Sequence, residues 1–136
     1  MKSGIFAGAI AGVVMGIVSI IISHILIGLR LIDPIGGLEI WDLSMQILLA
    51  LAEISLGLIW GSIFGAIYAY THDIIPSKGV IKGLYFGLII WLIKDVAAGS
   101  YTALILTQIQ TALLLIIYGF IMWIVYGLLL GYLYKK

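Results

Sequence analysis

The sequence contains no cysteine and no asparagine, only two prolines, and few charged residues. Without cysteine, the chain has no disulfides, iron–sulfur clusters or thiol chemistry. Charged residues make up 10% of the 136 residues, their formal net charge is +1, and they form no large basic patch. Because nucleic-acid binding depends on such a patch, we expect no nucleic-acid partner.

Apolar residues dominate what is present. Hydrophobic residues make up 64% of the chain, and its mean hydropathy is +1.28. A soluble domain of this length cannot bury so much apolar surface, so the composition predicts that lipid surrounds the chain. A membrane-spanning helix needs roughly 20 residues, which leaves room for about four spans in a single transmembrane domain. The first apolar run is much longer than the core of a signal peptide, so we expect it to be the first span.

Polar and helix-breaking segments divide the chain and predict an all-α integral membrane bundle of four transmembrane helices. Pro34 with Gly36 and Gly37 interrupts the first apolar run, and Pro76 follows the second. The predicted spans are residues 3–29, 43–70, 79–95 and 107–134. The segment 96–106 remains open between helical, interfacial and re-entrant structure, and residues 101–106 either lie at the outer interface or begin the last helix.

Lysine and arginine positions predict the orientation of the bundle, because cytoplasmic loops carry an excess of these residues. Arg30 and Lys94 lie on or near one side of the predicted bundle. The other side carries Lys2, Lys78, Lys82, Lys135 and Lys136. We therefore expect a multi-pass protein of the prokaryotic plasma membrane, with both termini and the middle loop in the cytoplasm.

Every predicted span carries glycines at intervals of four residues, which places them along one helix face. Such glycines allow two backbones to approach closely in a membrane. On the predicted orientation they lie in the cytoplasmic half, so the helices are expected to separate toward the outside. The predicted packing glycines are Gly8, Gly12, Gly57, Gly61, Gly65, Gly83, Gly87, Gly127 and Gly131.

The two halves of the chain share glycine and tyrosine spacings. The glycines at 4, 8 and 12 match those at 79, 83 and 87, and the spacing that ends at Tyr68 matches the spacing that ends at Tyr134. These matches favour an internal repeat of two helical hairpins about an axis along the membrane normal. The alternative is that small-residue packing patterns have recurred by chance.

A few polar residues fall on the glycine faces in the outer half of the predicted bundle. Glu53 precedes Gly57 by four residues and Lys94 follows Gly87 by seven, so both stay near their glycine stripe. We expect Glu53 and Lys94 to meet across the second and third helices, with Asp95 and His24 beside them. The candidate residues for a substrate or ion are Glu53, Lys94, Gln46, Ser23, Gln108, Asp95 and His24.

Two interpretations of these polar residues remain open. A buried ion pair can fix helix register without any further role. Intramembrane ionisable residues also mark solute and proton pathways. His24 lies about 80° away from its stripe, a position typical of an interfacial histidine.

No pattern for catalysis is present. Intramembrane enzymes need paired carboxylates, a serine–histidine pair or a metal cluster, and the glycines lie within apolar helices rather than after a strand. We therefore expect no enzymatic activity, no cofactor and no metal.

Four segments carry a resemblance to a known group: AGAIAGVVMG at 7–16, GLIWGSIFGAIY at 57–68, KGLYFGLIIWL at 82–92 and VYGLLLGYLY at 125–134. Their pattern resembles the YagU-like group of small polytopic membrane proteins. The resemblance implies an integral inner-membrane protein and no particular activity.

The sequence supports two functional hypotheses. The first is a transporter or channel for a small solute or ion, with an outward-facing polar cavity centred on Glu53 and Lys94. The second is a non-catalytic accessory or structural subunit of a larger membrane complex, with residues 97–99 as a contact patch of small side chains. Membrane lipid is the expected surrounding in both, and a homo-oligomer is compatible with either.

Overall fold

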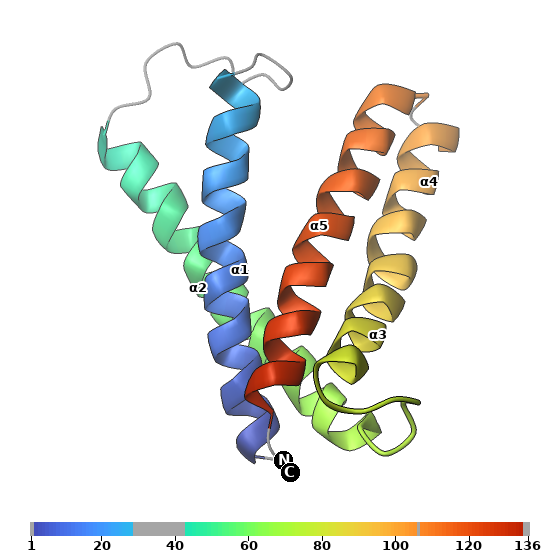
Figure 1. Ribbon diagram of the computed structural model, residues 1–136. Helices are drawn as coiled ribbons and strands as arrows, with labels where there is room; N and C mark the ends of the chain where they lie inside the picture. The colour runs from blue at the N-terminus through green and yellow to red at the C-terminus, as the bar shows by residue number, and fades with distance from the viewer. Residues whose placement is uncertain (1, 29–42, 106, 135–136) are drawn as a thin grey trace.

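The computed structural model describes residues 2–28, 43–105 and 107–134, and Figure 1 shows their arrangement. All the regular secondary structure in these residues is helical, without strands, which confirms the predicted all-α class. The elements are α1 (Lys2–Gly28), α2 (Leu43–Thr71), α3 (Gly79–Trp91), the π-helical segment η2 (Leu92–Val96), α4 (Ala97–Ile105) and α5 (Ile109–Leu133).

Three of these helices are long and apolar enough to cross a membrane. The spans are Ser3–Leu26 in α1, Ser44–Thr71 in α2 and Ile109–Leu133 in α5, with mean hydropathies between 2.0 and 2.7. Their side chains also leave many large apolar groups exposed, including Ile21, Leu51 and Ile117. A membrane location is consistent with both observations, because lipid covers such surfaces.

The third predicted span does not end at residue 95. The π-helical segment η2 follows α3 directly, and α4 follows η2 directly, so the three elements form one helical rod beside α5 (Figure 1). Of the two alternatives left open for residues 101–106, the one in which they begin the last helix is wrong for 101–105, which belong to α4. A π turn keeps the backbone hydrogen-bonded, so the polar residues at 94 and 95 widen the helix without ending it.

Glycines bring α1 and α2 into close contact. A Cβ atom added to Gly8 would overlap the carbonyl oxygen of Gly61, and one added to Gly12 would overlap that of Gly57. Farther along the pair, Gly16 lies against the backbone of Glu53. The absence of side chains at these positions therefore sets which turns of α1 and α2 face each other.

A second pair is formed by α5 and the helical rod. Gly83 of α3 lies against the backbone of Gly127 and Gly131, and Gly87 lies against the carbonyl oxygen of Trp123. Gly99 of α4 is buried against the Ile116 side chain, so it does not contribute to the exposed small-residue patch that was expected at 97–99. The two pairs are joined where α1 packs against α5.

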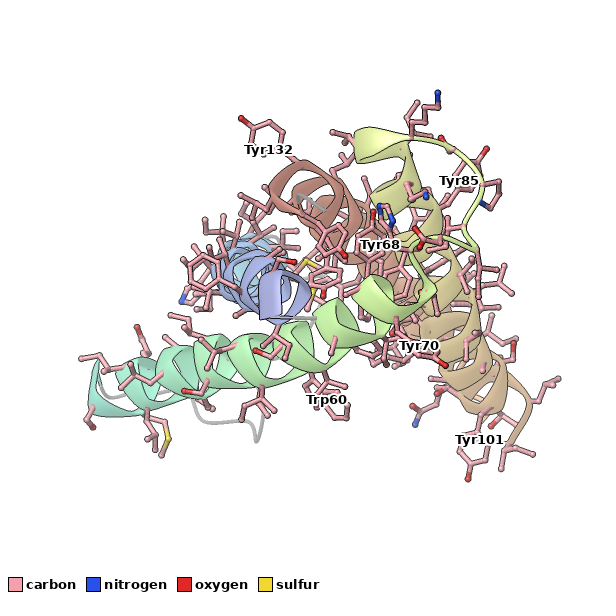
Figure 2. All side chains as sticks on the ribbon, turned by 90° about the horizontal axis from the view of Figure 1, so that it is seen from below. Trp60, Tyr68, Tyr70, Tyr85, Tyr101 and Tyr132 are labelled. Atoms are coloured by element: carbon pink, nitrogen blue, oxygen red, sulfur yellow. The ribbon has the colours of Figure 1, made fainter. Side chains whose placement is uncertain are left out.

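The buried core occupies the half of the molecule in which the two pairs approach each other. The start of α1 and the end of α5 lie at this end, and the pairs separate toward the other end, so the bundle has a narrow end and a wide end (Figure 1). Tyr68 points inward between the helices, whereas Tyr85, Tyr101 and Tyr132 point outward (Figure 2). The core residues are Ala7, Ala11, Tyr68, Ile75, Phe86, Trp123, Tyr126 and Leu130.

Several predicted features lie outside the described residues. These are the breaks at Pro34, Gly36 and Gly37, the charges at Arg30, Lys135 and Lys136, and residue 106.

Candidate functional site

A cavity of about 220 Å³ lies midway along the helices, above the buried core. Its walls come from four elements: α1, α2, η2 and α5. The lining residues are Met15, Gly16, Ser19, Glu53, Leu56, Gly57, Trp60, Phe64, Lys94, Asp95, Tyr118, Gly119, Met122 and Trp123. The cavity therefore joins the two glycine-packed pairs and contains both carboxylates that the sequence places in the middle of apolar segments.

Glu53 is held by a hydroxyl group from α1. Ser19 Oγ donates a hydrogen bond to Glu53 Oε2 at 3.1 Å, and the Ser19 side chain is buried. This contact follows from the glycine packing, because Gly16 seats α1 on the backbone of Glu53 and Ser19 lies on the next turn. Ser19 also bonds to the hydroxyl of Tyr118, which interacts in turn with Ser23. Residues from α1, α2 and α5 thus form one polar network.

Asp95 is anchored by α5. The indole nitrogen of Trp123 donates a hydrogen bond to Asp95 Oδ2, and Lys94 Nζ forms an ion pair with Asp95 Oδ1 at 3.1 Å. A Cβ atom added to Gly119 would lie 2.5 Å from Asp95 Cγ and 2.6 Å from Oδ2. The carboxylate therefore occupies the space that a side chain at position 119 would fill, and only 15% of its side chain is exposed.

Lys94 does not take the position expected for it. It lines the same cavity as Glu53, but among the described residues its ion pair is with Asp95, and 61% of its side chain is exposed. A regular α-helix places residue 94 near the stripe of Gly87. The i→i+5 turns of η2 contain one more residue each, so the inward position passes from Lys94 to its neighbour Asp95.

Aromatic rings form much of the remaining wall. The ring of Phe64 stacks on Trp60, with centroids 5.9 Å apart, and meets the ring of Trp123 edge to face at 5.1 Å. Lys94 Nζ lies 5.9 Å from the Trp123 ring centroid, within the range of a cation–π contact. With both carboxylates and the ammonium ionised, the lining carries two negative charges and one positive charge.

The other predicted site residues lie outside this lining. His24 bonds through Nδ1 to the carbonyl oxygen of Ile20 on its own helix, at 2.8 Å. Gln46 is half-buried near the start of α2, and Gln108 is exposed immediately before α5. Ser23 reaches the site through the Tyr118 hydroxyl.

The prediction from sequence missed the residues that complete the site on α1 and α5. Trp123 stands four residues after Gly119 and four before Gly127, so the glycine interval itself placed it on the inner face. Ser19 stands three residues after Gly16, which also returns to the same face. Tyr118 has no comparable signal, because its neighbour Gly119 is the residue on the stripe.

Within the described residues, histidine and acidic side chains nowhere gather in a group of three that would hold a metal ion. Comparisons with protein-family models, with curated proteins and with solved structures found no match to this chain.

Proposed function

We propose that this protein is a small membrane transport protein, a transporter or channel, whose solute or ion passes through the cavity at Glu53. The observation that carries the proposal is a carboxylate side chain in a cavity, within the candidate membrane span Ser44–Thr71 of α2. A charge at this depth is costly and is generally retained where it contacts a permeating species. The network from Glu53 through Ser19 to Tyr118 gives such a species polar partners on three helices.

In the proposed topology the chain crosses the membrane four times. The helices α1, α2 and α5 make three of the crossings, and the rod of α3, η2 and α4 together makes the fourth. Lys78 and Lys82 near the start of α3 support a cytoplasmic position for the narrow end, because cytoplasmic loops carry an excess of lysine and arginine. The wide end then faces outward, with the cavity below it. The two glycine-packed pairs, α1 with α2 and α3 with α5, are the two hairpins of the proposed internal repeat.

The direct test is transport by purified protein in proteoliposomes. Proton influx is followed with an entrapped pH dye, and uptake is measured for radiolabelled rubidium and for a panel of small cationic and zwitterionic solutes. We expect flux of at least one of these above that of empty liposomes, and we expect Glu53→Gln to abolish it. The glutamine retains an oxygen that accepts the Ser19 hydrogen bond, so its stability should stay near wild type.

The matched control is Asp73→Asn, which removes a carboxylate from the exposed loop after α2. Flux through this variant should equal the wild-type flux. Equal flux through Glu53→Gln and wild type would contradict the proposed role of Glu53.

A further inference from the structure

The walls of the cavity differ in character, and this difference points to a class of ligand. Glu53 and Asp95 supply negative charge, while Trp60, Phe64 and Trp123 supply aromatic surface. A quaternary or protonated ammonium is the ligand group that both kinds of wall attract, since carboxylates neutralise it and ring faces stabilise it. Resting on the transport role proposed above, we propose that the cavity binds an organic monocation with an apolar body.

A cation is already placed at this site by the chain itself. Lys94 Nζ lies 5.9 Å from the Trp123 ring centroid and 3.1 Å from Asp95 Oδ1. These are the two contacts that an incoming ammonium would make. The Lys94 ammonium therefore competes with the ligand for the same position, and the ligand must displace it to bind. Its exposed, flexible side chain can leave without moving the helix.

The size of the cavity fits this class. An engineered apolar cavity of about 150 Å³ binds benzene. The present cavity, of about 220 Å³, is larger and has a charged wall, so it accepts a ring with a small ammonium group attached. A small inorganic cation would use only the oxygen atoms on one side of the cavity, whereas an organic cation also uses the aromatic side.

Access to the cavity also favours a ligand with an apolar part. α1 packs against α2 and α5, and α5 packs against the rod of α3, η2 and α4, whereas contacts between α2 and this rod are few. Trp60 is 52% exposed and lies on the face of α2 away from α1 (Figure 2). An amphipathic cation dissolved in the bilayer meets an aromatic side chain here before it meets the carboxylates.

The test is equilibrium binding of radiolabelled benzyltrimethylammonium to the protein in lipid nanodiscs. Wild type should bind it, and benzylsulfonate, an anion of similar shape, should compete poorly. Lys94→Met removes the competing cation and should lower the Kd by about tenfold, whereas Glu53→Gln should raise it by about tenfold. Lys94→Arg keeps the charge and should bind no more tightly than wild type.

The matched control is Lys78→Met, which removes the same charge from an exposed position outside the cavity. It should change the Kd by less than about twofold, because solvent screens a distant charge. Lys94→Gln serves as a second neutral variant, should Lys94→Met fold poorly.

Three results would overturn the inference: Lys94→Met and Lys94→Gln binding no more tightly than wild type, benzylsulfonate competing as well as the cation, or no binding by any variant. Its failure is distinguishable from failure of the transport role. Tight binding in nanodiscs without flux in proteoliposomes would retain the ligand class and refute transport. Glu53-dependent flux of other solutes, without binding of this cation, would retain transport and refute the ligand class.

Discussion

Replacing Gly119 with alanine places a methyl group against the Asp95 carboxylate. The new Cβ atom would lie 2.5 Å from Cγ and 2.8 Å from Cβ of Asp95, whereas ordinary contacts between carbon atoms are about 3.5–4.0 Å. The carboxylate must therefore move by about 1 Å, which breaks its hydrogen bond from Trp123. The Trp123 side chain is only 3% exposed, so its N–H then lacks both this partner and bulk water.

The expected change in the free energy of unfolding has three parts. Overpacking costs about 1–3 kcal/mol, and loss of a side-chain hydrogen bond in a membrane protein costs about 1–2 kcal/mol. Alanine is a better helix former than glycine by up to about 1 kcal/mol, which offsets part of the loss. Together these give a destabilisation of about 2 kcal/mol.

The assay is unfolding in mixed micelles by added dodecyl sulfate, followed by tryptophan fluorescence. Gly28→Ala is the control, because nothing lies within 4 Å of a Cβ atom at that position. Its stability should stay within about 0.5 kcal/mol of wild type. Repeating Gly119→Ala in an Asp95→Gly background, which removes the three atoms that the new methyl group would meet, completes a double-mutant cycle, and the cost should vanish there. An equal cost in both backgrounds would refute the explanation, because the clash would not involve Asp95.

Three further predictions address the rest of the bundle. Tyr126→Phe removes the hydrogen bond from the Tyr126 hydroxyl to the Gly61 carbonyl oxygen and should lower stability in the same assay by about 1 kcal/mol, whereas Tyr132→Phe, at a 70% exposed position, should change it little. Because the chain has no cysteine, Ser77→Cys and Thr107→Cys introduce single labels at opposite ends, and a membrane-impermeant maleimide on intact cells should react with the second alone. Reaction of the first alone would invert the proposed orientation. Native mass spectrometry of protein purified from its own membrane should show the chain alone or as a homo-oligomer; a stoichiometric larger partner would favour the accessory-subunit hypothesis.

Part of the candidate site was visible in the sequence, because regular helices have a fixed period. Glu53 lies on the same face as Gly57, and the structure places both in the cavity lining. The four-residue spacing of Trp123 from Gly119 and Gly127 could have placed it on the same face, but an aromatic residue on an apolar helix face is usually interpreted as a packing residue. The sequence gives no sign that its indole N–H would hold a carboxylate from another helix.

Other parts depended on departures from that period. The exchange of Lys94 for Asp95 at the inward position follows from the π turns of η2, which no spacing rule for α-helices contains. The continuation of the rod through residues 97–105 has the same origin, since residues 94–100 look like a helix end when only their polarity is considered.

The sequence by itself determined that this chain is helical and apolar enough for a membrane, because composition and local hydrogen bonding within each segment do not depend on distant residues. It also determined which faces carry glycine. The sequence also predicted that Glu53, Lys94 and Asp95 lie near one another, and only the tertiary structure decided which partner each of these charges has. Those pairings join Ser19 to Glu53 and Trp123 to Asp95 across separate helices, and they depend on backbone separations and a local change of helix period that arise when the helices pack.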